Sequence, residues 1–229
     1  MPDHIRVAII GAGPAGLGVA RVLRDLTIPD VWLLERGKIG HRFLDWPTEA
    51  RFITPSFQGN VFGITNLNAI SYDSSPGWSL RSEHPDGKSY AEYRALAANT
   101  FGVNVQCSID VQSVEPKHDD EGFDIETNNG RISSDFVIWA CGHIGDPSDD
   151  DLLGANLGRH YSSMPSWKDV AGGQVYVIGG YESGIDAAIG MDQNDKEVVV
   201  LDSSARWLDG DKDPSCSLSP YTHQRLSAA

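Results

Sequence analysis

The feature that most constrains this fold is a glycine-rich turn near the N-terminus, placed between an apolar run and a helical pattern. The turn, Gly11-Ala-Gly-Pro-Ala-Gly16, follows the apolar residues 7–10 and precedes a helical pattern over residues 17–26. A second apolar run, residues 31–34, ends at Glu35. Because two parallel strands joined by a helix connect in a right-handed sense, we expect a strand–helix–strand start whose helix covers one face of a sheet.

Each glycine of this turn has a specific role in a dinucleotide-binding site. Gly11 permits the tight turn, Gly13 lets the backbone approach a pyrophosphate, and Gly16 lets helix and strand pack closely. The exposed amides at the helix N-terminus then bind phosphates. Glu35 lies 24 residues beyond Gly11, where a carboxylate can accept hydrogen bonds from both hydroxyls of an adenosine ribose. We therefore expect dinucleotide binding here, and a purely structural glycine turn is the alternative.

The middle of the chain combines a long irregular stretch, a helix and several short strands. Residues 37–87 are rich in proline, glycine and serine, and loops this long are usually functional. Residues 89–99 are good helix formers. Short β-type runs cover residues 103–107, 109–114, 123–127 and 131–133, with a hairpin turn at 128–130, and predict a small antiparallel meander. The apolar residues 136–140 then predict a separate strand of the kind found inside a parallel sheet.

The strand–glycine turn–helix–strand pattern of the N-terminus is repeated further along the chain. After a polar stretch, residues 174–178 form a second apolar run that leads into Gly179-Gly-Tyr-Glu-Ser-Gly184, a helix over 185–191 and a strand ending at Asp202. We predict an α/β fold with two Rossmann-like units, a small antiparallel meander and an incomplete second unit. The expected domains are residues 1–145, a linker over 146–170, and residues 171–229.

The second glycine turn is a weaker dinucleotide signal than the first, because Tyr181 replaces its middle glycine. Asp202, 23 residues after Gly179, favours an unphosphorylated ribose, whereas Ser203, Ser204 and Arg206 could hold a 2′-phosphate. The choice between NADH and NADPH therefore stays open, and a degenerate repeat kept for packing is the alternative.

Charge and cysteine content narrow the function classes. The formal net charge is −14, from 32 acidic and 18 basic residues, and such a surface does not attract nucleic acid or anionic membranes. The three cysteines lack C-x-x-C and zinc-ligand spacings, so we expect no disulfide framework and no metal site, in a reducing compartment. Residues 7–10 are too short a run for a signal sequence or a membrane span, and a cytoplasmic protein is expected.

Two dinucleotide folds in one chain suggest electron transfer from a nicotinamide to a flavin. The first glycine turn with Glu35-Arg36, the strand end Phe136-Val-Ile-Trp-Ala-Cys-Gly142 and the segment Val177-Ile-Gly-Gly-Tyr-Glu-Ser-Gly-Ile-Asp186 together resemble the two-dinucleotide-binding flavoprotein oxidoreductases. Within them the chain is similar to the branch of flavin-containing monooxygenases and bacillithiol-disulfide-reductase-like proteins.

The resemblance implies that the first unit binds FAD, with the pyrophosphate at the glycine turn and the ribose on Glu35. Thr54 and Ser56 resemble the loop that passes the flavin, and a proline turn with capping hydroxyls is the alternative. Val111 resembles the position whose backbone meets the adenine, and residues 140–142 resemble the crossing to the second unit. The cofactor-binding residues expected in the first unit are Gly11, Gly13, Pro14, Ala15, Gly16, Glu35, Arg36, Thr54, Ser56, Val111, Ala140, Cys141 and Gly142. Those expected in the second unit are Gly179, Gly180, Tyr181, Glu182, Ser183, Asp202 and Arg206.

Three departures from the family limit what the resemblance carries over. The absence of C-x-x-C excludes the dithiol chemistry of thioredoxin-reductase-like members. Gly154, His160 and Trp167 echo the Baeyer–Villiger-type signature, but at different spacing. The family also returns to its FAD domain with a final Gly-Asp segment that this sequence does not contain, so we expect a C-terminally truncated form. Cys141 stands at a strand tip, where we expect a small buried residue in preference to a redox thiol.

We therefore expect an NAD(P)H-dependent FAD oxidoreductase. A hydride would pass from the nicotinamide to FAD, and the electrons would pass on to oxygen and a substrate, as in a monooxygenase, or to a disulfide. A truncated, non-catalytic dinucleotide-binding module is the alternative. No residue is assigned as catalytic, because the isoalloxazine carries the chemistry in flavoproteins. The expected partner is a small-molecule substrate, and a homodimer is the candidate assembly.

Overall fold

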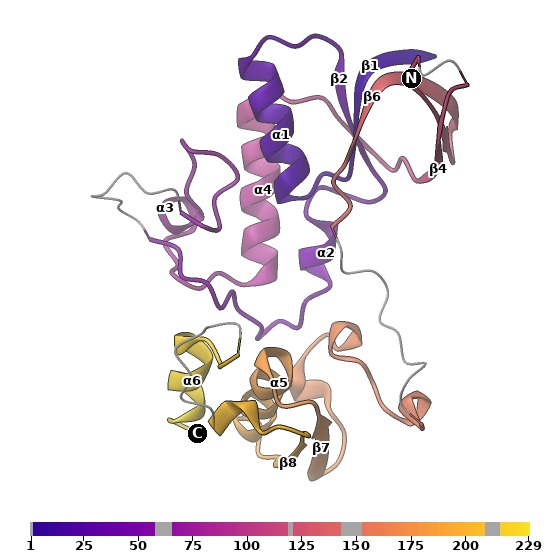
Figure 1. The fold of residues 1–229 in the computed structure, drawn as a ribbon. Helices are drawn as coiled ribbons and strands as arrows, with labels where there is room; N and C mark the ends of the chain where they lie inside the picture. Colours follow the sequence, from indigo (N-terminus) through magenta and orange to yellow (C-terminus); the bar gives the residue numbers. More distant parts are fainter. Residues whose placement is uncertain (1, 58–65, 119–120, 143–152, 209–215) are drawn as a thin grey trace. The chain divides into compact units, whose positions relative to one another are not determined.

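The structure is a computed structural model that describes residues 2–57, 66–118, 121–142, 153–208 and 216–229 (Figure 1). The chain divides into two compact units. Unit 1 comprises Met1–Leu44, Phe57–Ser82 and Ser89–Gly145, and unit 2 comprises Asp45–Ser56, Glu83–Lys88 and Asp146–Ala229. The expected boundary at 145/146 and the start of the expected linker 146–170 lie outside the described residues. In the ranges that are described, no helix is long and apolar enough to cross a membrane.

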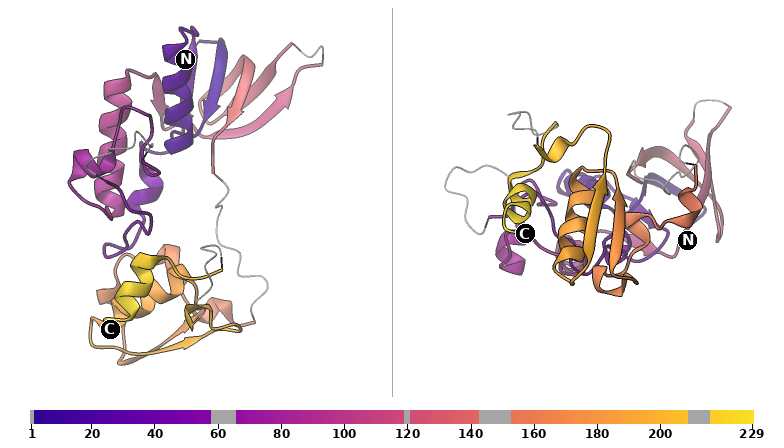
Figure 2. Two further views of the ribbon diagram at one scale, coloured as in Figure 1. Left: turned by 60° about the vertical axis from the view of Figure 1, so that its left-hand side comes forward. Right: turned by 90° about the horizontal axis from the view of Figure 1, so that it is seen from below.

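Unit 1 is built on one six-stranded sheet with the order β3-β2-β1-β6-β5-β4. The strands are β1 (His4–Ile10), β2 (Val31–Glu35), β3 (Val105–Cys107), β4 (Val111–Pro116), β5 (Phe123–Thr127) and β6 (Gly130–Trp139). β3, β2, β1 and β6 run parallel, and β5 and β4 continue the sheet in antiparallel pairing. Helices α1 (Pro14–Asp25) and α4 (Gly87–Phe101) lie together on one side of the sheet (Figures 1 and 2). The predicted strand–helix–strand start and the α/β fold class are confirmed.

The prediction of two separate strands at 131–133 and 136–140 was wrong, because β6 is continuous. Its first half pairs with β5 and its second half with β1, and at the overlap Ser134 pairs with both Phe123 and Ile5. Ser134 and its neighbour Asp135 resemble a loop in the sequence, but Ser134 is completely buried. The meander is therefore a continuation of the main sheet.

Several other elements differ in extent from the sequence-based expectation. The irregular stretch 37–87 contains two short helices, α2 (His41–Leu44) and α3 (Pro76–Leu80), and α4 is longer than the predicted 89–99 at both ends. Ser75 caps α3, since its hydroxyl accepts a hydrogen bond from the Trp78 N–H at 3.3 Å. The C-terminal helix α6 (Pro220–Leu226) was not predicted.

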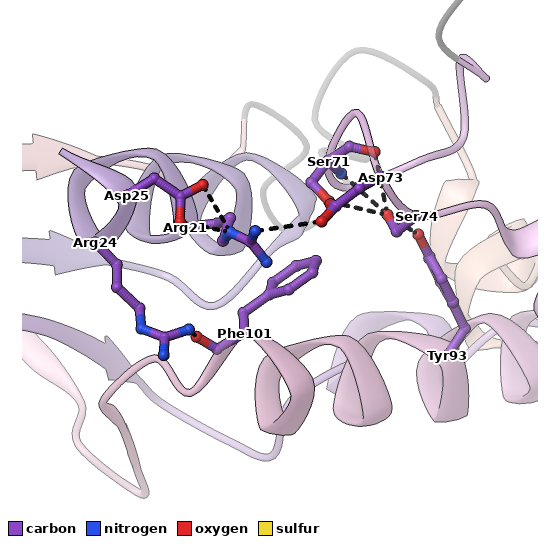
Figure 3. Close-up of polar contacts among 8 residues, drawn as sticks. All are labelled: Arg21, Arg24, Asp25, Ser71, Asp73, Ser74, Tyr93 and Phe101. Atoms are coloured by element: carbon purple, nitrogen blue, oxygen red, sulfur yellow. Dashed lines mark hydrogen bonds and ion pairs between the residues drawn. The ribbon is translucent and has the colours of Figure 1, made fainter.

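Polar contacts join α1 to the segments around it (Figure 3). Arg21 of α1 donates to the Asp73 carboxylate at 3.2 Å, and its guanidinium lies 5.0 Å from the centre of the Phe101 ring of α4. The Tyr93 hydroxyl of α4 is 2.7 Å from the Ser74 hydroxyl. These contacts hold α4 against α1 and the segment between them.

Unit 2 has a parallel strand pair, β7 (Gln174–Ile178) and β8 (Glu197–Leu201), joined by α5 (Glu182–Asp192), with both strands visible in the right-hand view of Figure 2. Trp167 and Met164 lie in its core beside α5. The Trp167 ring covers Gly190, where an added Cβ would stand 2.1 Å from Trp167 Cδ1. The aromatic side chain therefore requires a glycine at this turn of α5.

Candidate functional site: the two glycine turns

The first glycine turn has two glycines that the chain itself requires. Gly11 has a φ of +102°, and an added Cβ would stand 2.7 Å from the Ala140 carbonyl oxygen. At Gly16 an added Cβ would stand 2.0 Å from the Gly11 carbonyl oxygen. The turn and the start of α1 are therefore packed backbone against backbone, and any side chain at either position forces them apart.

Gly13 differs from the other two, because the described chain contains no packing reason for it. It is the N-cap of α1 with an extended backbone, φ −69° and ψ 176°. An added Cβ would find one described heavy atom within 4 Å, the Ala140 carbonyl oxygen, at an ordinary 3.6 Å. The first turn of α1 carries Pro14 at its start and no acidic residue. The space outside this helix N-terminus thus fits an anionic group that approaches the backbone.

The turn lies at a topological switch point of the sheet, where the strands that follow β1 in the chain lie on opposite sides of it. From β1 the chain proceeds to β2 on one side and later returns to β6 on the other. The Gly11 N–H donates to the Leu34 carbonyl at 2.8 Å, and the Ala140 N–H donates to the Ile10 carbonyl at 2.9 Å. The carboxyl ends of these three strands therefore meet at the turn, which is where open α/β sheets bind ligands.

Glu35 lies beside this turn and has accepting capacity left. One carboxylate oxygen accepts from the Ala12 N–H and the other from the Gly37 N–H, both at 2.9 Å. A carboxylate offers about four acceptor sites, so two remain for a ligand such as a ribose. Arg36 is exposed next to it. The Ile109 N–H donates to the Glu35 carbonyl at 2.9 Å, which places the start of β4, with Val111, near this strand end.

Cys141 contradicts its sequence-based expectation. The residue is exposed rather than buried, because β6 ends before it and the next residue, Gly142, is also exposed. Its thiol donates to the Ile10 carbonyl at 3.4 Å. Partial burial of the sulfur and the charge of Glu35 raise the pKa of the thiol. The sulfur is therefore held as a thiol, which is a poor nucleophile.

Thr54 and Ser56 belong to unit 2, whereas the first glycine turn belongs to unit 1. Ser56 is buried, and its N–H donates to the Glu83 carbonyl at 2.7 Å. The structure therefore does not bring these two residues together with the turn within one unit.

Sequence reasoning missed Arg94 on α4. The side chain is 3% exposed, and one of its terminal nitrogens, Nη2, donates to the Ala12 carbonyl in the middle of the glycine turn. Its Nε has no hydrogen-bond partner among the described residues. The helical spacing of Tyr90, Arg94, Ala97 and Phe101, all buried, is the signal that places this arginine on the inner face of the helix.

The second glycine turn repeats the first at two positions and differs at the third. Gly179 has a φ of +98°, and an added Cβ at Gly184 would stand 1.8 Å from the Gly179 carbonyl oxygen. At Gly180 an added Cβ would stand 1.9 Å from Trp207, so an indole ring covers this glycine. Tyr181 is the N-cap of α5, and its ring lies 5.5 Å from the Arg206 guanidinium.

Asp202 accepts four hydrogen bonds from its own chain. Its carboxylate accepts from the N–H groups of Gly180, Ser204 and Ala205, each at 2.8 Å, and from the Ser204 hydroxyl at 3.0 Å. The hydrogen bond from Gly180 and those from Ser204 and Ala205 lower the pKa of Asp202 to about 2. Three of these hydrogen bonds end on Oδ1 and one, from Gly180, ends on Oδ2, so Oδ2 keeps an acceptor site.

The remaining cofactor-binding residues expected at the second glycine turn, Glu182 and Ser183, differ in their surroundings. The Glu182 carboxylate accepts hydrogen bonds from the Ser219 N–H and from the Thr222 hydroxyl, the latter at 2.6 Å, and so anchors α6. Ser183 is exposed. Asp186, one turn further along α5, pairs with Arg225 and accepts from the Tyr161 hydroxyl at 3.0 Å.

Fold and turns together define a class: α/β proteins with two successive glycine-turn, Rossmann-like units. Comparison with known proteins defines the family. The chain belongs to the pyridine nucleotide-disulphide oxidoreductase family, whose sequence pattern matches residues 8–229. This confirms the resemblance inferred from the two fingerprints.

Individual relatives include a monooxygenase and a disulfide reductase. A Baeyer–Villiger monooxygenase of Streptomyces coelicolor is 28% identical over 216 residues, which cover 90% of this chain and 39% of the relative. The solved bacillithiol disulfide reductase Bdr (YpdA) of Staphylococcus aureus superimposes with a TM-score of 0.75 at 22% identity, over 99% of this chain and 64% of the other. The protein OTEMO, solved in complex with FAD and NADP, superimposes with a TM-score of 0.67 at 18% identity, over 98% and 44%. The chain spans about half the length of the curated relatives it matches.

Proposed function

We propose that this chain binds FAD at the first glycine turn and NAD(P)H at the second, and that it serves an NAD(P)H-dependent flavoprotein oxidoreductase. The observation that carries the proposal is at Gly13. The described chain places no atom that excludes a side chain there, whereas close approach of a pyrophosphate does require glycine. Family membership and a solved relative that holds FAD and NADP support the same assignment.

The residues of the first turn would hold the two halves of FAD. The N-terminus of α1 would face the pyrophosphate, and the two unused acceptor sites of Glu35 would take ribose hydroxyls. The backbone at Val111 would meet the adenine. When bound, FAD would accept a hydride from NAD(P)H and deliver electrons to oxygen and a substrate, or to a disulfide.

The second turn would hold the nicotinamide dinucleotide. Its glycines and the N-terminus of α5 with Tyr181 and Ser183 would face the phosphates. Arg206 is exposed five residues beyond the end of β8 and would take a 2′-phosphate if NADPH is the donor. The substrate would be a small molecule and the candidate assembly a homodimer. The location would be a reducing one such as the cytoplasm, in keeping with an odd number of cysteines that lack C-x-x-C spacing.

A specific observation favours a second candidate, a dinucleotide-binding module without hydride transfer. The Trp207 ring covers Gly180, and Asp202 already accepts four hydrogen bonds from its own chain, twice as many as Glu35. In this form the second unit packs as a Rossmann-like unit but takes no nicotinamide.

The experiment is flavin binding followed by anaerobic reduction of the purified chain. We expect bound cofactor released by heat to run as FAD, and not FMN, because Glu35 is placed for an adenosine ribose. NADH or NADPH should then bleach the flavin absorbance. Gly13→Val should abolish flavin retention, and folding of the variant is checked by circular dichroism.

Each outcome decides between the candidates. FAD retention with bleaching supports the oxidoreductase. FAD retention without bleaching by either nicotinamide supports the binding module. Failure of the wild-type chain to bind FAD, or equal retention by Gly13→Val, refutes the assignment of the first turn.

A further inference from the structure

Arg94 is a buried cation without a direct ion-pair partner in the described chain, and the carboxylate whose charge acts on it is that of Glu35, on the other side of Ala12. No ion pair forms between its guanidinium and any described carboxylate, and its Nε has no acceptor. Its neighbours are the Phe43 ring, 5.0 Å from the guanidinium carbon, and the Ala12 carbonyl. Burial lowers the pKa of Arg94, but an arginine stays protonated in proteins. A buried charge of this kind destabilises a fold unless something pairs with it.

The position of this cation shows what would pair with it. Ala12 lies inside the glycine turn and is held from two sides, because its N–H donates to Glu35 and its carbonyl accepts from Arg94. The two side chains that hold the turn therefore carry opposite charges. Beyond the turn lies the space at Gly13, which the described chain leaves open to an anionic group.

The hydrogen bond to the Ala12 carbonyl and the Phe43 ring keep the guanidinium against the turn, and the helix that carries it is itself held in place. α4 is tied to α1 and to the preceding segment by the Arg21 and Tyr93 contacts of Figure 3. The charge is thus fixed behind the turn before any ligand binds, and a low local dielectric strengthens its field at the ligand.

We propose that Arg94 is the internal counter-charge for the diphosphate of the dinucleotide at the first glycine turn, and the residue that positions the turn for it. The inference rests on the proposed FAD site. Arg94 acts through the Ala12 carbonyl and through its charge, so it is a positioning residue and not a catalytic one. The site would consequently favour ligands that carry a diphosphate over ligands that carry only adenine and ribose.

The test compares ADP with adenosine, which share adenine and ribose and differ in the two phosphates. The affinities of both ligands are measured in wild type, Arg94→Met and Arg94→Lys. Each ligand is titrated to displace FAD, and the change in FAD fluorescence is recorded. We expect Arg94→Met to reduce the preference for ADP over adenosine by about tenfold or more, because a fixed charge several ångströms away contributes at this scale. Arg94→Lys keeps the charge and should keep most of the preference.

A matched control separates charge from packing. Arg24 of α1 also donates to a backbone carbonyl, that of Phe101, but does not contact the turn, so Arg24→Met should leave the preference unchanged. Should Arg94→Met fail to fold by circular dichroism, the shorter neutral Arg94→Gln replaces it.

The outcomes distinguish this inference from the proposed function. A wild-type chain that binds neither FAD nor ADP refutes both. If the wild type binds both but Arg94→Met weakens ADP and adenosine equally, Arg94 is merely structural and the counter-charge is refuted alone.

Discussion

Replacing Gly16 by alanine tests the claim that the first glycine turn and α1 are packed backbone against backbone. The added Cβ would stand 2.0 Å from the Gly11 carbonyl oxygen, and real Cβ contacts are essentially never under 3.0 Å. The two backbone segments must therefore separate by about 1 Å, a form of overpacking that costs roughly 1–3 kcal/mol. For a chain of this size, that loss lowers the midpoint of thermal unfolding by about 2–12 °C.

Gly13→Ala is the matched control, because it adds the same methyl group three residues earlier. The nearest described atom would be at 3.6 Å, and the backbone there is one that alanine adopts. The stability change should stay within about 1 kcal/mol, mainly from the poorer N-cap. The methyl group would instead occupy the space we assign to the pyrophosphate, so FAD affinity should fall.

The assay is thermal unfolding without ligand, followed by circular dichroism, together with FAD titration. Gly16→Ala should lower the midpoint, while Gly13→Ala should lower affinity and leave the midpoint nearly unchanged. An unchanged midpoint for Gly16→Ala would refute the packing argument. An equal loss of stability in both variants would show that the space at Gly13 is not open.

Three further predictions concern single side chains. The pKa of Asp202, about 2, lies below the value of about 3.9 for an unfolded chain. The carboxylate therefore stabilises the fold above about pH 4, and this contribution is lost as the pH falls through about 2. A carbon NMR titration of Asp202 with a midpoint near 4 would contradict the four hydrogen bonds. Trp167→Ala should cost about 3–5 kcal/mol in denaturant unfolding, because the ring is fully buried in unit 2, and a loss below 1 kcal/mol would contradict that burial. Burial raises the pKa of Tyr90 to about 12, and its hydroxyl donates to the Asn68 carbonyl at 2.8 Å; ultraviolet titration should find this phenol neutral at pH 10.5, and Tyr90→Phe should cost about 0.5–1.5 kcal/mol.

Elements with a strong local signal could be predicted from the sequence. The first turn and its flanking strands and helix follow from glycine spacing and apolar periodicity, which report contacts between residues near one another in the chain. The repeat at Gly179 is recognisable for the same reason. The position of Glu35 beside the turn follows from strand length alone.

What a side chain contacts across the chain required the tertiary structure. Asp202 and Glu35 hold equivalent places after their strands, yet Asp202 accepts four hydrogen bonds, from Gly180 and from residues 204–205, while Glu35 accepts two. The Glu182 carboxylate binds α6, and nothing in the sequence of the glycine turn indicates this partner. Hydrogen-bond capacity is shared among all groups that fold within reach, so a residue's sequence position does not decide which partner takes it.

By itself the sequence determined the two Rossmann-like beginnings, because tight turns and close backbone approach leave glycine as the residue that fits at Gly11, Gly16, Gly179 and Gly184. Only the tertiary structure decided that β6 is one strand and that the Arg94 side chain contacts the Ala12 carbonyl of the first turn. Periodicity can place a residue on the inner face of a helix, but a strand that changes partner midway and the partner of a buried cation depend on segments distant in the sequence, of which local periodicity carries no record.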